Sequence, residues 1–346
     1  MSILIRKELW AIHGDSVKGV SHEKSGLPNQ DAWSSKYEGN SLVLAVADGH
    51  GNSKSFRSDR GAKIAVKVAT ETLIEFAKAF ATPYNLGDVE HSMTSALAKE
   101  IVNRWQNLVN DDLRANAFDE KEFAILSSEN RQLVEKSPLV AYGATVIGVI
   151  ITESFIGYIQ LGDGDVLVIS ENGEVSRPLP RDERLIANET TSLCGSGISC
   201  SKHRPSVVPT GAWADFRVGI SQAITHLPVL IIVSTDGYSN SFRTEADFLK
   251  VGSDYLEIIR KEGVNYLKEN LHDWLVDASK AGSGDDITLG IIYRMENSVT
   301  NDNVDKQLEI ASKPTQTFIS RIFSCKSRKS NQAFRSQLDT GDDNNG

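Results

Sequence analysis

Two short apolar runs, each ending in an Asp-Gly pair, constrain the fold of this chain most strongly. The segment LAVADGHG covers residues 44–51, and VLIIVSTDG covers residues 229–237. Short apolar runs bounded by a turn signal predict strands that are buried on both faces. The glycine beside each aspartate lets another backbone or an ion approach closely. The two runs therefore predict buried strands that each hold a carboxylate rigidly at a strand end.

Periodicity predicts the other elements as blocks of helices and blocks of strands. Apolar residues at helical spacing predict helices over 59–81, 88–117, 245–249, 255–262 and 264–281. A period of two predicts strands over 143–151, 155–162, 166–170 and 174–178, with one more strand over 287–294. The pair Asn172-Gly173 is typical of a tight hairpin, so we interpret the first four of these strands as an antiparallel meander.

Two further stretches give weaker signals. The polar stretch 118–138 is typical of an insert or a short amphipathic helix, and residues 181–226 are rich in loop signals. From residue 295 to 346 the chain is polar and aperiodic, which predicts a disordered C-terminal tail after one globular unit over 1–294. A small basic-aromatic patch lies over 318–330 in this tail. We interpret it either as a linker or short docking helix, or as a segment that weakly contacts a partner or a membrane surface.

Composition excludes several classes of protein. The chain has 346 residues, 40% of them hydrophobic and 24% charged, as in ordinary globular proteins. A formal net charge of −9 argues against general nucleic-acid binding. Three cysteines make neither a disulfide framework nor a zinc site, and we find no secretory signal and no apolar run long enough to cross a bilayer. We therefore expect a cytoplasmic protein without a nucleic-acid partner and without a transmembrane segment.

Four aspartates share the same position at the end of a predicted strand. These are Asp48, Asp163, Asp236 and Asp285. A single Asp-Gly pair is usually only a turn, but several converging carboxylates would repel one another unless a cation lay between them. Hard divalent cations prefer oxygen ligands, so the set predicts a site for Mg²⁺ or Mn²⁺. The DGD segment at 163–165 does not have the acid spacing of a calcium loop.

An ordered set of six motifs makes a family resemblance specific. The motifs are NQDAW (29–33), VADGHG (46–51), GATVIGVI (143–150), GDGD (162–165), VSTDGYSN (233–240) and GSGDDIT (282–288). Together they resemble the metal-dependent PP2C (PPM) family of protein serine/threonine phosphatases over most of residues 10–294. The resemblance implies an α+β fold, a four-layer α-β-β-α sandwich of two packed antiparallel sheets flanked by helices. It also implies a phosphatase domain over 1–294 that acts on a phosphorylated protein and opposes a serine/threonine kinase.

The resemblance also implies roles for individual residues. Asp48 would bridge two Mn²⁺ or Mg²⁺ ions, the carbonyl of Gly49 would bind the second ion, and Asp236 and Asp285 would complete the first. Asp31 would hold metal-bound water, and Asp163 with Asp236 would take a third, looser ion. His50 would be the general acid for the leaving alkoxide. Two ions about 3.5–4 Å apart can lower the pKa of a bridging water and neutralise the phosphoryl oxygens during in-line attack.

The chain departs from the family pattern at two positions. Gln30 stands where the family often has glutamate, and Gly26 stands where it often has the arginine that grips the substrate phosphate. His22 and Lys24 are the nearest replacements for that arginine. Either one of them binds the phosphate, or both are ordinary surface residues.

Two other functions compete with that of an active protein phosphatase. One is a catalytically weak relative that binds a phosphoprotein as a regulatory module. The other is a phosphohydrolase of small metabolites, which the missing arginine would allow. Asp48, Asp236 and Asp285 are all present, and this completeness of the ligand set favours an active phosphatase.

Overall fold

The computed structural model describes residues 10–80, 85–182, 190–195, 211–222 and 227–295, all within the compact unit Met1–Asn297. In this part of the chain the strands form two five-stranded sheets, and every strand pairing is antiparallel. The predicted tail over 295–346, apart from Met295 itself, and its patch over 318–330 lie outside the described residues.

Each sheet is built from strands that are distant in sequence. The first sheet has the order β1 (Trp10–Val17), β10 (Ile287–Arg294), β9 (Leu230–Ser234), β6 (Asp165–Ile169) and β7 (Val175–Ser176). The second has the order β2 (Ala32–Glu38), β3 (Ser41–Ala47), β4 (Val146–Ile151), β5 (Phe155–Leu161) and β8 (Arg217–Gln222).

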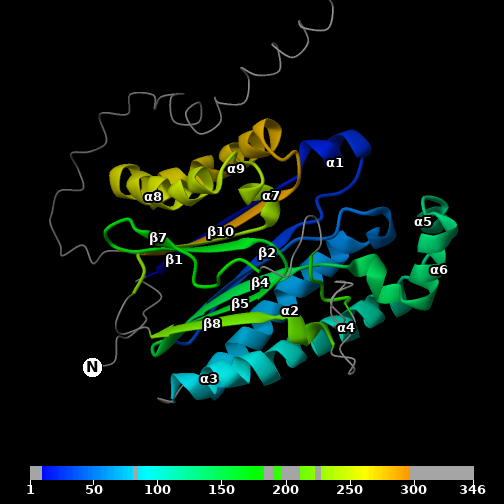
Figure 1. Cartoon of the computed structure of the whole chain (residues 1–346), viewed down its shortest axis with the longest axis horizontal. Helices are drawn as coiled ribbons and strands as arrows, with labels where there is room; N and C mark the ends of the chain where they lie inside the picture. Colours follow the sequence, from blue (N-terminus) through cyan, green and yellow to red (C-terminus); the bar gives the residue numbers. More distant parts are fainter. Residues whose placement is uncertain (1–9, 81–84, 183–189, 196–210, 223–226, 296–346) are drawn as a thin grey trace, which may run out of the picture. The chain divides into compact units, whose positions relative to one another are not determined.

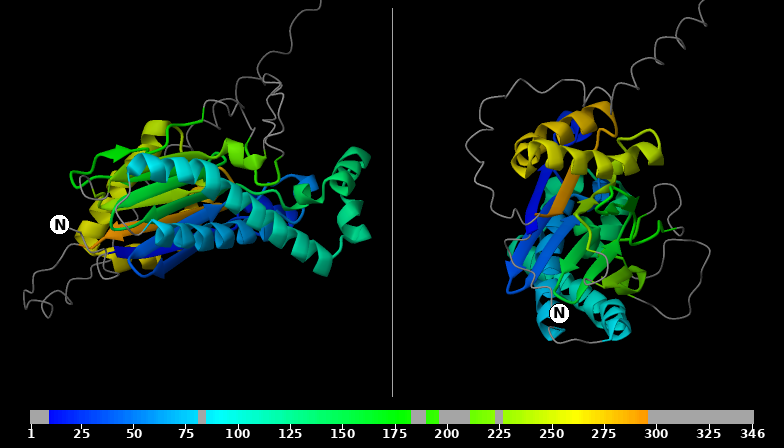
Figure 2. Two further views of the ribbon diagram at one scale, coloured as in Figure 1. Left: turned by 90° about the horizontal axis from the view of Figure 1, so that it is seen from below. Right: turned by 90° about the vertical axis from the view of Figure 1, so that its left-hand side faces the viewer.

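Long helices cover the outer face of each sheet (Figure 1). On the second sheet, α2 (Ser58–Ala79) packs against β2, β3 and β4 and against α4 (Ala98–Ala115). On the first sheet, α8 (Glu245–Glu262) packs against β6 and β7, and α9 (Val264–Ala281) packs against β1 and β10. The right-hand view in Figure 2 shows the same succession of helices, sheet, sheet and helices. The predicted four-layer α-β-β-α sandwich is confirmed.

Short elements connect these layers. They are α1 (Val20–Ser25), η2 (Ser53–Ser55), α3 (Leu86–Ser92), the π-helical turn η3 (Met93–Leu97), α5 (Glu120–Ala124), α6 (Ser128–Lys136), η4 (Pro138–Tyr142), η5 (Ala212–Asp215) and α7 (Asp236–Ser239). Helices α5 and α6 occupy the polar stretch in which an insert or one short helix was predicted. None of the helices in the described part of the chain has the length and apolar character needed to span a bilayer.

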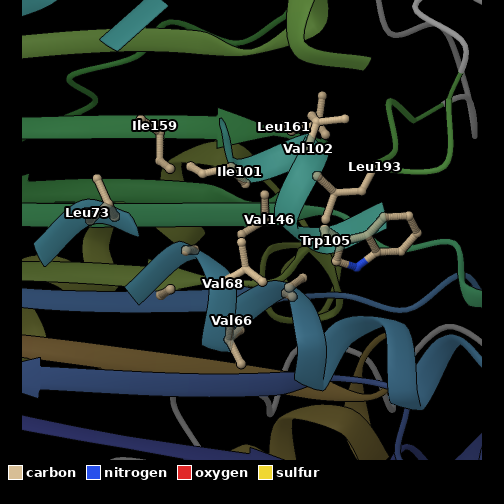
Figure 3. Packing of buried hydrophobic residues seen from close by; sticks show 14 of the residues in the cluster. Val66, Val68, Leu73, Ile101, Val102, Trp105, Val146, Ile159, Leu161 and Leu193 are labelled. Atoms are coloured by element: carbon tan, nitrogen blue, oxygen red, sulfur yellow. The ribbon is translucent and has the colours of Figure 1, made fainter. Parts of the chain in front are cut away.

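Two layers of apolar side chains hold the sandwich together. One lies between the second sheet and helices α2 and α4, where Val68, Ile101, Trp105 and Val146 pack together (Figure 3). The other lies between the two sheets, as strands β3, β4 and β9 are buried along their length. Complete burial of one such side chain contributes about 1.5–3 kcal/mol, so the two layers fix the strand ends that they flank.

The predicted four-stranded meander is wrong. β4 and β5 pair in the second sheet, whereas β6 and β7 pair in the first, and β6 takes β9 as its other neighbour. The hairpin at Asn172-Gly173 is confirmed, because it joins β6 to β7. The chain changes sheet at residues 162–164, where Gly162 has a φ of 112° that other residues rarely adopt. This crossing places Asp163 between the two sheets.

In three other places the sequence prediction was wrong or incomplete. Residues 245–262 form a single helix, α8, rather than two. The absence of a Cβ at Gly252 lets α8 approach β6 closely, since a Cβ there would lie 2.8 Å from Ile169 Cγ1. The stretch 181–226, which is rich in loop signals and hard to assign, contains η5 and β8, an edge strand that is only half-buried. Strands β1 and β2 were not predicted at all, because neither is a continuous apolar run.

Candidate active site

The four predicted aspartates line one cavity at the strand ends. Asp48 follows β3, Asp163 lies between β5 and β6, Asp236 begins α7 directly after β9, and Asp285 precedes β10. The cavity has a volume of about 730 Å³, and Gly49 and His50 also line it. The structure therefore brings together residues from both sheets that the sequence places far apart.

Three of these carboxylates are close enough to share an ion. One carboxylate oxygen from each of Asp48, Asp163 and Asp236 lies within 4.8 Å of the other two. Asp285 lines the same cavity but is more exposed and lies outside this trio. The structure thus groups Asp163 with Asp48 and Asp236 more tightly than it groups Asp285 with them.

Neutral groups hold the trio in place. Thr145 accepts a hydrogen bond from the Asp48 N–H through Oγ1 at 3.0 Å, and its own N–H donates to the Asp48 carbonyl at 2.8 Å. Thr190 Oγ1 donates to Asp163 Oδ1 at 2.9 Å, and Asn240 Nδ2 donates to Asp236 Oδ2 at 3.0 Å. These contacts orient the trio and bring no positive charge to it.

Burial and mutual repulsion raise the pKa values of these carboxyl groups. Burial raises the pKa of Asp48 well above its ordinary value, and the charges of Asp31, Asp236 and Asp163 raise it further. Burial and the charge of Asp163 raise the pKa of Asp236 to about 6. Burial is also the main cause of the raised pKa of Asp163. Like charges held together in a low-dielectric pocket favour protonation unless a cation neutralises them.

This donor set fits a divalent cation. Carboxylate oxygens are the ligands that Mg²⁺ and Mn²⁺ prefer, and an open cavity leaves room for water and substrate to complete the coordination. Gly49 also lines the cavity, and the role of its main-chain carbonyl as a ligand stays a prediction. The trio, Asp285 and Gly49 are therefore the residues that could hold such ions.

Asp31 supports the trio and does not line the cavity. Its side chain is 5% exposed, and its Oδ2 accepts a hydrogen bond of 2.7 Å from Thr235 Oγ1. Burial raises its pKa well above the ordinary value, and the nearby charges of Asp286 and Asp236 add to this rise. A carboxylate in this position can bind water that lies between it and the trio.

His50 lies on the cavity wall directly after the metal-binding candidates. Its N–H donates to the carbonyl of Gly143 at 3.0 Å, which fixes the backbone that carries the imidazole. Burial lowers the pKa of His50 to about 4, and the charge of Lys54 lowers it too. At neutral pH the imidazole of the free protein is therefore uncharged.

His22 and Lys24 both lie on the short helix α1, outside the set of side chains that line the cavity. His22 is 8% exposed, and its Nδ1 lies 2.8 Å from Asp286 Oδ2. Lys24 is exposed. The prediction that one of them binds the substrate phosphate stays a prediction.

A second group of residues on the cavity wall, the arginine cluster, was not found from the sequence. It consists of Arg177, Arg181, Arg217, Asp165 and Asp182. Arg177 Nε donates to Asp165 Oδ1 at 2.6 Å, and its Nη1 donates to Glu245. The only signal was a run of basic and acidic residues, SRPLPRDER (176–184), which spans the end of the strand predicted over 174–178 and the start of the loop-rich stretch 181–226. Such a run gives no indication of which charges will pair.

The fold and the acidic cavity agree with a family comparison. The model of the family described as protein phosphatase 2C matches residues 18–276. The chain belongs to this family. As a member of the protein phosphatase 2C family it is a phosphoprotein phosphatase.

A search of the curated proteins finds no match. Among solved structures, the catalytic domain of the serine/threonine protein phosphatase PstP in complex with two manganese ions is similar at 15% identity, covering 83% of this chain and 99% of that chain, with a TM-score of 0.46. Stp1 from Staphylococcus aureus is similar at 14% identity, covering 82% and 94%, with a TM-score of 0.46. RsbX in complex with magnesium is similar at 14% identity, covering 85% and 100%, with a TM-score of 0.43.

Proposed function

We propose that this protein is a metal-dependent phosphatase that hydrolyses phosphoserine and phosphothreonine in proteins phosphorylated by a serine/threonine kinase. The observation that carries the proposal is the approach of Asp48, Asp163 and Asp236 to within 4.8 Å on the wall of an open cavity. Three half-buried carboxylates without a cationic partner are costly for the fold, and a divalent cation turns that arrangement into a binding site.

The chain's own residues divide the work. Asp48, Asp163, Asp236 and Asp285 would hold Mn²⁺ or Mg²⁺, with the Gly49 carbonyl as a further ligand. Two such ions, when bound, would lower the pKa of the attacking water and neutralise the phosphoryl oxygens, and a third ion would be held more loosely. Asp31, held by Thr235, would orient water behind the trio.

His50 would protonate the leaving oxygen of the serine or threonine. An alkoxide is a poor leaving group, so proton transfer to it lowers the barrier. The imidazole is neutral in the free protein because its pKa is about 4. The dianionic phosphate of the substrate, placed in the same cavity, favours the protonated form of His50 and so prepares the acid for this step.

The test measures hydrolysis of a phosphothreonine peptide and of p-nitrophenyl phosphate by the purified full chain with Mn²⁺ and with Mg²⁺. We expect metal-dependent hydrolysis of both substrates, and a loss of at least about 100-fold in kcat/KM in Asp48→Asn and Asp236→Asn. Asp273→Asn is the matched control, because Asp273 is an exposed residue of α9 outside the cavity.

Each outcome has a distinct meaning. Full activity in the presence of a chelator, or in Asp48→Asn, would contradict the proposal. Weak hydrolysis of peptides beside fast hydrolysis of a small phosphorylated metabolite would replace the substrate class and keep the metal site. A larger loss on the phosphopeptide than on p-nitrophenyl phosphate in His50→Gln would support the general acid, since p-nitrophenolate leaves without protonation.

A further inference from the structure

A buried carboxylate behind the active site ties three segments together. Asp286 is 4% exposed, and its Oδ1 accepts a hydrogen bond of 2.6 Å from the N–H of Gly19. Its Oδ2 accepts one of 2.6 Å from the N–H of Gln30 and lies 2.8 Å from His22 Nδ1. A carboxylate only accepts hydrogen bonds, so Nδ1 of His22 is the donor in the third contact. Nε2 lies on the other side of the imidazole ring.

Nε2 of His22 and a buried acceptor of Gln30 face the same small recess. His22 Nε2 and Gln30 Oε1 each lie 3.7 Å from the point that a Cβ on Gly51 would occupy. Gln30 is 3% exposed, and its Oε1 has no hydrogen-bond partner among the described residues. Gly51 itself lines the catalytic cavity, so the recess opens from that cavity.

The chemistry of the recess selects its ligand. Buried polar atoms in folded proteins almost always have a partner, which is often an ordered water. Gln30 Oε1 is an acceptor and requires a donor, and a water molecule can donate to it while it also contacts Nε2 of His22. A phosphate dianion carries no hydrogen and cannot donate to Gln30 Oε1.

The recess is coupled to the metal-binding loop through the backbone. The carbonyl of Gln30 accepts a hydrogen bond of 3.1 Å from the N–H of Gly49, which follows Asp48. Gln30 is therefore fixed to the loop on its carbonyl side and to Asp286 on its amide side. A ligand that joins the Gln30 side chain to His22 would hold residues 48–51 against α1.

We propose that the recess bounded by His22, Gln30 and Gly51 binds a water molecule that braces the metal-binding loop, and that Asp286 and His22 are positioning residues for divalent cations. The last step rests on the proposed function, because it takes the trio to be the cation site. Groups that orient metal ligands change metal affinity or activity by about 10–100-fold when they are removed.

The test is Mn²⁺ affinity, measured by electron paramagnetic resonance titration of the full chain without substrate. Gly51→Ala adds a methyl group whose 3.7 Å contacts cause no clash, yet the methyl group fills the recess. His22→Asn keeps a donor for Asp286 and removes the Nε2 atom that faces the recess. We expect each variant to bind Mn²⁺ about 10-fold more weakly with a nearly unchanged melting temperature. Lys24→Ala, on the same helix and exposed, is the control and should change neither quantity.

The outcomes separate this inference from the proposed function. Unchanged Mn²⁺ affinity in both Gly51→Ala and His22→Asn would overturn it, and His22→Asn alone decides if Gly51→Ala does not fold. A raised KM for the phosphopeptide with unchanged Mn²⁺ affinity in His22→Asn would also overturn it and would assign His22 to phosphate binding. Failure of the wild-type chain to bind Mn²⁺ would instead overturn the proposed function, and with it the role of the recess.

Discussion

The acidic trio and the arginine cluster line the same cavity but differ in how their charge is balanced. Asp48, Asp163 and Asp236 lie within 4.8 Å of one another, with only neutral groups as hydrogen-bond donors. In the arginine cluster, Arg177 is paired with Asp165 and Glu245. Both groups are polar and partly buried, but only the charge of the second is neutralised by the chain itself.

The pKa values show the consequence of this difference. The pKa of Asp236 is raised to about 6, because burial and Asp163 both oppose its charge. Burial likewise opposes the charge of Arg177, but Asp165 and Glu245 more than compensate, so that its pKa is raised and its charge is secured. A cluster of charged residues therefore indicates a cation site only where the chain leaves the charge unbalanced.

The largest expected effect comes from neutralising one member of the trio. In Asp236→Asn we expect kcat/KM to fall by at least about 100-fold, while the metal-free protein becomes more stable at pH 7 by about 1–3 kcal/mol. The gain in stability follows because the variant removes a charge that the fold disfavours. Enzyme kinetics with Mn²⁺ and urea denaturation with a chelator measure the two quantities. A loss of stability in the metal-free variant would show that the trio is not repulsive.

Replacing a charged residue of the arginine cluster should change the stability of the protein in the opposite direction. Arg177→Met leaves the carboxylate of Asp165, a residue only 5% exposed, without its partner, so we expect a loss of about 2–4 kcal/mol in the free energy of unfolding. Urea denaturation is again the measurement. The control is Arg114→Met, because the exposed pair of Arg114 and Asp111 is worth at most about 0.5 kcal/mol. Equal losses in the two variants would mean that burial of the pair is irrelevant.

The pH dependence of stability is a second property in which the acidic trio differs from the arginine cluster. The folded protein raises the pKa of Asp236 from 3.8 to about 6, so its contribution to stability is present in acid and is lost as the pH rises through about 6. With a chelator, we expect the free energy of unfolding to fall by about 1–3 kcal/mol between pH 4 and pH 7 from this group. Saturating Mn²⁺ should reverse the trend, because cations bind the ionised carboxylates. The same titration in Asp236→Asn should lack this component.

The same contrast explains how much of the site could be predicted from the sequence. An aspartate at the end of a buried run is a local pattern, so Asp48 and Asp236 were found from their own neighbours in sequence. The pairing of Arg177 with Glu245 depends on α8 packing beside β7, which no local pattern reveals. The unpartnered side chain of Gln30 likewise becomes visible only when Gly51 and His22 are placed beside it.

The fold shows a similar division between local and long-range information. Apolar runs predicted β3, β9 and β10, and helical spacing predicted α2 and α9, because those signals lie within each segment. The sheet to which a strand belongs is set by partners far away in sequence, so β6 was wrongly placed in a meander with β5. Edge strands such as β8 bury too little of their surface to produce a clear pattern.

The smallest expected effect concerns an exposed ion pair of the arginine cluster. Arg181 Nη1 lies 3.6 Å from Glu245 Oε2, and the Arg181 side chain is 59% exposed, so water and salt screen the pair. In Arg181→Met we expect the free energy of unfolding to change by less than about 0.5 kcal/mol and the Mn²⁺ affinity to stay within about two-fold of the wild type. Urea denaturation and Mn²⁺ titration at low and high salt measure both. Markedly tighter Mn²⁺ binding in this variant at high salt would show that the arginine cluster repels the cations directly. The arginine cluster and the acidic trio would then have to be treated as one electrostatic unit.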